Sequence, residues 1–195
     1  MQHKIAKKTL ADHIEEGNPL PGDLPDRAEQ IRNMLADTDF DQQVFDQNAD
    51  YVQAFSDVSH KFDLSGFEMT GSEDRFDREF NGTLVKFRPN FLVSRTTKAN
   101  TQKVGSGMFR YSKSGPVAEA VAQFQAAFMF GYFSNFPFIE EAKPEAELCF
   151  VLCANTGETH HTPNKPIYKF NEMKAVCSDI AEKWDNIGPP TNAVF

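Results

Sequence analysis

Residues 79–95 read EFNGTLVKFRPNFLVSR, and residues 102–113 read QKVGSGMFRYSK. Both segments are rich in β-branched and aromatic residues and are interrupted by glycine, which is typical of strands joined by turns. Together with FEMTG at residues 67–71, they predict three consecutive strands. Pro89 lacks the N–H that would donate to a neighbouring strand, so we expect a bulge, an edge or a bend at this position.

Helical patterns precede these strands. Residues 27–38 and 39–63 place apolar side chains at helical spacing. Before them, residues 17–26 contain three prolines and two glycines and predict a linker or an irregular arm. A chain of 195 residues is long enough for one domain with an extension. We therefore expect an acidic, partly helical N-terminal extension over residues 1–43 and a single α/β core domain over residues 44–195.

After the strands, the chain alternates between helix and strand. Residues 115–133 predict a helix that is apolar around most of its circumference, and residues 171–188 predict an amphipathic helix. Between them, the apolar residues 147–155 predict a buried strand, and residues 156–163 predict a turn that a short strand would follow. The fold class that accommodates this order is α/β (or α+β), with a central mixed β-sheet flanked by helices.

Positive charge is concentrated on the predicted strands. Residues 81–118 hold seven Lys or Arg and no Asp or Glu, although the chain has a formal net charge of -8. Residues 1–80 hold 18 acidic and 8 basic residues. The basic strands would either contact phosphate groups, as in nucleic-acid binding, or pair with the acids of the N-terminal half. The candidate nucleic-acid contacts are Lys86, Arg88, Arg110 and Lys113.

The order helix, three strands, helix, strand resembles the PD-(D/E)xK nuclease-like fold, which has a restriction-endonuclease-like core, over about residues 44–185. In that family, one strand carries an acid, often after proline, and the next carries an acid, a spacer and a lysine. The resemblance implies that the carboxylates hold a divalent metal which activates water. On this chain the first acid falls on Asn90, after Pro89, and the second motif falls on Met108 to Arg110. Neither carboxylate is present, so the resemblance implies a degenerate active site.

Three functions remain open at this point. The leading one is a non-catalytic, nuclease-like binding or regulatory module that contacts nucleic acid within a larger assembly and uses no cofactor. The second is a nuclease dependent on Mg²⁺ or Mn²⁺ with relocated acids. Its candidate catalytic residues are Glu68, Asp77, Glu79, Asn90 and Gln125, the last because polar residues on this helix can face the site in the resembling family. The third is a protein-binding partner or inhibitor that acts through the acidic residues 1–80.

Cys149, Cys153, His160 and His161 raise the question of a zinc site. On an extended strand, residues four apart are separated by roughly 13 Å. That distance is too long for two thiolates that each bind zinc at about 2.3 Å. We therefore expect two buried core thiols and no metal site.

The remaining composition bears on location. No apolar run approaches the roughly 18 residues that a membrane span requires, and the first residues lack the apolar core of a secretory signal. The three cysteines do not form a disulfide framework and suit a reducing compartment. We expect a cytoplasmic protein without a membrane partner.

Overall fold

The computed structural model describes residues 3–17, 21–62, 66–72, 75–111, 115, 117–139, 141–184 and 186–187. Its elements, in chain order, are α1 (Lys4–Glu15), α2 (Leu24–Arg32), α3 (Asp39–Val58), the 3₁₀ helix η1 (Ser59–Lys61), β1 (Glu68–Gly71), β2 (Phe76–Phe80), β3 (Thr83–Phe87), β4 (Phe91–Thr96), β5 (Gln102–Arg110), α4 (Glu119–Asn135), β6 (Lys143–Pro144), the 3₁₀ helix η2 (Ala146–Leu148), β7 (Phe150–Cys153), β8 (Thr159–His161) and α5 (Pro166–Trp184).

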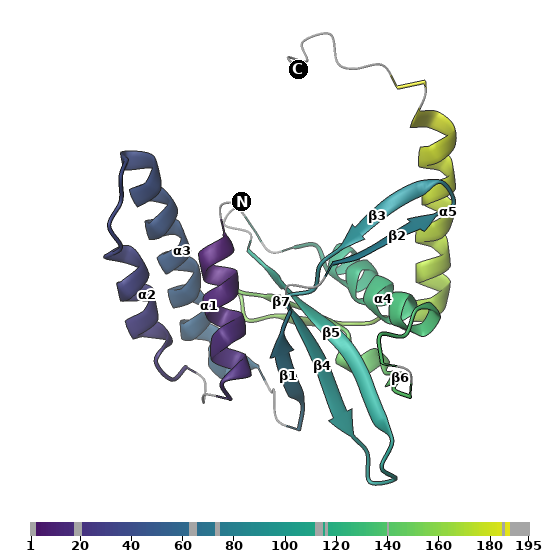
Figure 1. Ribbon diagram of the computed structural model, residues 1–195, viewed down its shortest axis with the longest axis horizontal. Coiled ribbons are helices and arrows are strands. Elements are labelled where there is room, and N and C mark those ends of the chain that lie inside the picture. Colours follow the sequence, from purple (N-terminus) through teal and green to yellow (C-terminus); the bar gives the residue numbers. More distant parts are fainter. Residues whose placement is uncertain are drawn as a thin grey trace.

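A mixed six-stranded sheet forms the centre of the molecule (Figure 1). Its strand order is β1-β4-β5-β7-β8, and the short β6 also pairs with β5. β4 runs antiparallel to both β1 and β5, whereas β7 runs parallel to β5 because α4 carries the chain back between them. The predicted α/β class with a central mixed sheet flanked by helices is confirmed; the restriction-endonuclease likeness stays a prediction.

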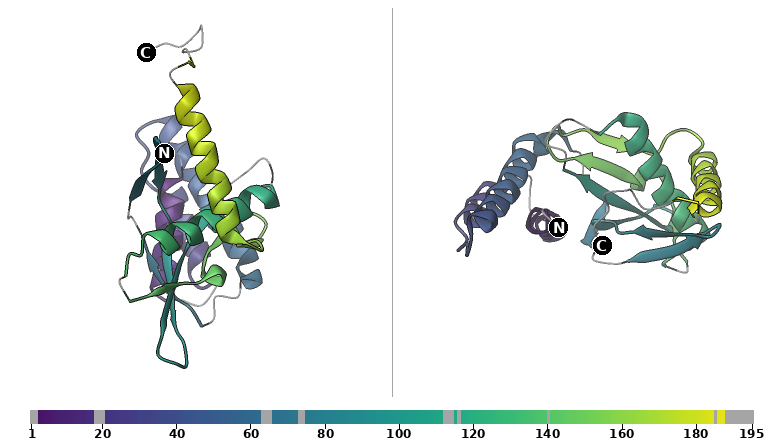
Figure 2. Two further views of the ribbon diagram at one scale, coloured as in Figure 1. Left: turned by 90° about the vertical axis from the view of Figure 1, so that its right-hand side faces the viewer. Right: turned by 90° about the horizontal axis from the view of Figure 1, so that it is seen from above.

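Helices α1, α2 and α3 lie on one side of the sheet, and α4 and α5 lie on the other (Figure 2). On the first side, Phe55 of α3 packs edge-on against Phe109 of β5, with ring centroids 5.4 Å apart. On the second, α4 covers Val151 of β7, and α5 packs on α4 where Gly131 leaves room for the ring of Phe170. A Cβ at Gly131 would lie 2.3 Å from that ring, so this close helix approach requires glycine.

The run of residues 79–95 forms more than the single strand that its texture predicts. Asn81 and Gly82 adopt positive φ values of 48° and 85°, as a tight hairpin turn requires, and they join β2 to β3 in a separate two-stranded sheet. The chain then bends at Pro89, as expected, and continues as β4 in the large sheet. The expectation of three strands over residues 67–113 is therefore wrong, because an Asn-Gly turn and a proline divide residues 79–95 among β2, β3 and β4.

The N-terminal helices share the hydrophobic core of the sheet. Ala6 and Leu10 of α1 and Leu24 of α2 are fully buried and belong to the same cluster as Phe91 and Phe150. The expected boundary between residues 43 and 44 falls inside α3, and the division into an extension and a core stays a prediction.

The final helix has an apolar surface that the described chain leaves uncovered. Trp184 of α5 is 68% exposed, and Val176 and Ile180 are also exposed. Among the described residues, no helix is long and apolar enough to cross a membrane.

Candidate anion-binding site

Arg88 lies where the chain bends between β3 and β4, and its surroundings are basic. It lines a cavity of about 320 Å³ together with Lys4, Lys7 and Lys8 of α1. The rest of the wall is formed by Ala11, Asp12, Glu15, Gly71, Ser72, Pro89 and Asn90. Helix α1 therefore adds three lysines to the β3–β4 bend, where the sequence alone identified Arg88 as the only cation.

Arg110 lies at the end of β5 and lines a second cavity of about 380 Å³. His3, Lys7 and Tyr111 line the same cavity. Lys7 thus borders both cavities and joins them into one basic region. We call Lys4, Lys7, Lys8, Arg88 and Arg110 the cationic site.

The acids at the cationic site are already engaged. Asp12 accepts a hydrogen bond from Lys8 at 3.2 Å, and Glu15 accepts one from the Gly71 N–H at 3.1 Å. Across the part of the chain that the structure describes, Lys4, Lys7, Arg88 and Arg110 form no ion pair with a carboxylate. Four of the five cations therefore have no direct carboxylate partner in the described part of the chain, while Asp12 and Glu15 keep their negative charge on the wall of the first cavity.

The pKa of Lys7 is lowered in this basic environment. Burial lowers the pKa of Lys7 from its ordinary value of 10.5, and the positive charge of Arg110 lowers it further. Both effects disfavour the charged lysine in the free protein. An anion placed between Lys7 and Arg110 would reverse the second effect.

Gln125 of α4 orients Arg110. Its Oε1 atom accepts a hydrogen bond of 2.8 Å from Nε of Arg110. Because an amide oxygen carries no net charge, this bond positions the guanidinium without neutralising it, and it leaves the Nη donors available for an anion. Gln125, a candidate catalytic residue in the sequence, is thus placed beside Arg110.

Asn90 has a structural role at the bend. Its Oδ1 accepts the N–H of Phe109 at 2.7 Å, and its backbone N–H donates to the carbonyl of Gly107 at 3.0 Å. Its own carbonyl accepts the N–H of Ser72 at 2.9 Å. Asn90, a candidate catalytic residue in the sequence, therefore ties three segments together at the edge of the first cavity.

The other candidate acids do not gather around Asn90. Glu68 lies on β1, the edge of the large sheet, where it accepts a hydrogen bond of 3.3 Å from Ser94. Asp77 and Glu79 lie on β2 in the small sheet, and Asp77 is opposite Lys86 of β3. Lys86 is therefore placed on the hairpin rather than in the cationic site, and Lys113 lies outside the described residues.

A cation of the basic strands is paired, but with acids of the C-terminal half and not with the acids of residues 1–80 that the alternative required. Arg95 of β4 forms ion pairs with Glu145 at 2.6 Å and Glu147 at 3.3 Å, both from the C-terminal half. Within the described ranges, no ion pair joins a cation of residues 81–111 to an acid of residues 1–80.

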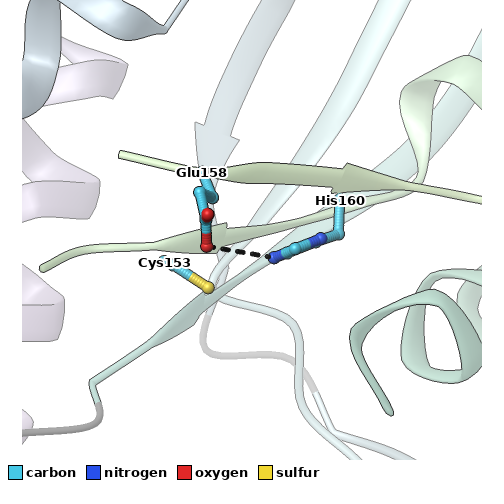
Figure 3. A group of neighbouring side chains, drawn as sticks. All are labelled: Cys153, Glu158 and His160. Atoms are coloured by element: carbon cyan, nitrogen blue, oxygen red, sulfur yellow. Dashed lines mark ion pairs between the residues drawn. The ribbon is translucent and has the colours of Figure 1, made fainter. Parts of the chain in front are cut away.

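A second group of polar side chains lies on the β7–β8 hairpin (Figure 3). The ligand atoms of Cys153, Glu158 and His160 all lie within 4.8 Å of one another. Cys149 and His161 are not part of this group. Sequence reasoning missed it because it measured Cys153 along one strand to Cys149, whereas the hairpin brings Glu158 and His160 across from the neighbouring strand.

The contribution of α1 to the cationic site was also missed. The sequence does place lysines at positions 4, 7 and 8, and residues three and four apart share one surface of a helix. The charge count over residues 1–80 concealed this cluster in a strongly acidic total.

No family model and no curated protein matches this chain.

Proposed function

We propose that this protein is a non-catalytic, nuclease-like binding module whose cationic site contacts the phosphate groups of nucleic acid. The observation that carries the proposal is the convergence of five cations from α1, the β3–β4 bend and β5 on two adjoining cavities, where four of them have no carboxylate partner among the described residues. The positive charge of Arg110 disfavours the charged form of Lys7 in the free protein, and an anion bound between them would offset that repulsion.

Nucleic acid is the anion that this arrangement suits best. Two cavities that share Lys7 would accommodate neighbouring phosphates on one strand, and Arg110 would bind a phosphate through its free Nη donors. Phosphate contacts of this kind release counterions and make the affinity depend on salt. The net charge of -8 would repel nucleic acid elsewhere and so orient its approach toward the cationic site.

We propose a non-catalytic role because the side chains that stand at the acid positions of the resembling family's motif are poor ligands for Mg²⁺. Asn90 uses its side-chain oxygen within the fold, and Met108 supplies a thioether that is unsuited to Mg²⁺. In the described part of the chain, the group able to hold a metal contains a cysteine and a histidine, not the all-oxygen ligand set of a Mg²⁺ site. The term nuclease-like in this proposal rests on the PD-(D/E)xK resemblance of the sequence.

The test is a fluorescence anisotropy titration of labelled single- and double-stranded DNA and RNA at several salt concentrations. The variant Arg88→Gln/Arg110→Gln is compared with Lys98→Gln/Lys103→Gln, which removes the same charge from the β4–β5 hairpin region. We expect the first variant to bind at least 10-fold more weakly and to show a salt slope smaller by about 2, and the second to resemble the wild type.

Equal affinity of both variants, or no binding by the wild type at low salt, would contradict the proposal and direct attention to protein partners of residues 1–80. The same substrates are incubated with Mn²⁺ and with EDTA. Cleavage that requires Mn²⁺ would favour the metal-dependent nuclease instead.

A further inference from the structure

The β7–β8 hairpin carries three side chains with different donor atoms that point toward one another (Figure 3). Cys153 ends β7, Glu158 lies directly before β8, and His160 lies within β8. The thiol sulfur, a carboxylate oxygen and an imidazole nitrogen all lie within 4.8 Å of one another. In a tetrahedral zinc site with bonds of about 2.0–2.3 Å, neighbouring ligand atoms are about 3.5 Å apart, so a small closure of the side chains would complete the site.

Two observations distinguish this group from a chance contact. The Nε2 atom of His160 is buried and has no hydrogen-bond partner, although a buried polar atom ordinarily has one. It lies 3.8 Å from Oε2 of Glu158, which is too long for a hydrogen bond. A cation between these two atoms would give Nε2 of His160 the partner that it lacks.

The hairpin holds the group in place. The N–H of Cys153 donates to the carbonyl of Glu158 at 2.9 Å, and the N–H of Gly157 donates to the carbonyl of Cys153 at 2.9 Å. The hydroxyl of Thr156 donates to Oε2 of Glu158 at 3.2 Å. Outer hydrogen bonds of this kind orient metal ligands. The ligands thus require little reorganisation to bind an ion.

We propose that Cys153, Glu158 and His160 bind a divalent cation of the Zn²⁺ class. A thiolate and an imidazole select a borderline-soft ion over Mg²⁺ or Ca²⁺. Binding breaks the S–H bond of Cys153 and releases the proton to solvent. The resulting thiolate and the carboxylate together neutralise the two charges of the ion, which matters because Arg110 is the register neighbour of Cys153 on β5. Glu158 has a side chain that is 55% exposed and provides the route of entry, and three protein ligands leave one coordination position for water.

The experiment uses tag-free, full-length protein stripped of metal and titrated with Co²⁺ and then with Zn²⁺ in competition with a chromophoric chelator. We expect one equivalent of Co²⁺ to produce a thiolate-to-metal charge-transfer band, and Zn²⁺ to displace it. Cys153→Ser should abolish the band, and Glu158→Gln and His160→Ala should each weaken Zn²⁺ binding at least 10-fold. His161→Ala is the matched control, since His161 lies on the same strand outside the group.

No charge-transfer band from the wild type, or binding that survives all three substitutions, would overturn the proposal. Loss of binding in His161→Ala with retention in His160→Ala would overturn it as well. Circular dichroism of each variant checks that the fold is retained, and the wild-type result stands even where a variant fails to fold. The measurement does not involve nucleic acid, so its outcome is separate from that of the proposed function.

Discussion

The Lys7 ammonium on α1 and the Arg110 guanidinium on β5 border the same cavity, without a carboxylate to pair with either among the described residues. Burial first and the neighbouring arginine second lower the pKa of Lys7. The first helix therefore extends the positive charge of the strands instead of neutralising it. The charge of Lys7 is therefore unfavourable for the stability of the free protein but favourable for binding an anion.

Replacing Lys7 with methionine should separate these two properties. The variant loses an unfavourably placed charge, so we expect its melting temperature at pH 7 to rise by on the order of a degree or two. Its affinity for labelled DNA should fall several-fold, because a phosphate contact is lost. Thermal melts and anisotropy titrations measure the two effects. Lys4→Met, at an exposed lysine of the same helix, should leave the melting temperature unchanged; an equal rise in both variants would contradict the explanation.

The pH dependence of this effect has a definite sign. Because the folded pKa of Lys7 is lowered, the unfolded state binds more protons between the folded pKa and the ordinary value of 10.5. The wild type should gain stability as pH rises through that window, relative to Lys7→Met. The stability difference between the two proteins should thus be present at pH 7 and shrink toward alkaline pH. Urea unfolding at several pH values measures it, and a difference that grows with pH would refute the assignment.

Gln125→Glu should convert a positioning contact into an ion pair. A carboxylate at the 2.8 Å contact with Arg110 would neutralise the guanidinium that the amide leaves charged. We expect several-fold weaker DNA binding and a salt slope smaller by about 1. Gln123→Glu makes the same charge change on the same helix, where Gln123 bonds to Glu119 and not to Arg110, and should bind nearly as the wild type does. Similar losses in both variants would mean that only the net charge matters.

Asn90→Ala should destabilise the protein by about 1–3 kcal/mol, because the N–H of Phe109 loses its acceptor in a partly buried position. Asn90→Asp retains an acceptor oxygen and should cost clearly less. Urea unfolding monitored by circular dichroism compares the two variants. If aspartate were as harmful as alanine, the hydrogen bond to Phe109 would not be the reason that this residue matters.

Leu10→Ala tests whether α1 is part of the core. Leu10 is fully buried in the cluster that also contains Phe91 and Phe150, so we expect a loss of about 2–5 kcal/mol. Ala11→Gly on the same helix is the control, with an expected loss of about 1 kcal/mol from helix propensity alone. An equally small loss for Leu10→Ala would indicate that α1 is a dispensable arm.

The strand-rich texture and helical periodicities of the sequence were sufficient to predict a mixed sheet flanked by helices. These local patterns are reliable because apolar spacing reports directly which face of an element is buried. The split of residues 79–95 into β2, β3 and β4 was also encoded locally, by Asn81, Gly82 and Pro89, although only the proline was interpreted as a break.

Sequence alone determined where the charges lie along the chain and that residues 81–118 contain no carboxylate side chain. Only the tertiary structure decided which charges meet. Lys7 reaches Arg110 because the apolar side of α1 packs against the sheet and so fixes the direction of its lysines, and Cys153 meets His160 because a hairpin reverses the chain. The first contact depends on packing between elements distant in the sequence and the second on the pairing of two strands, and linear spacing alone does not determine which side chains then meet.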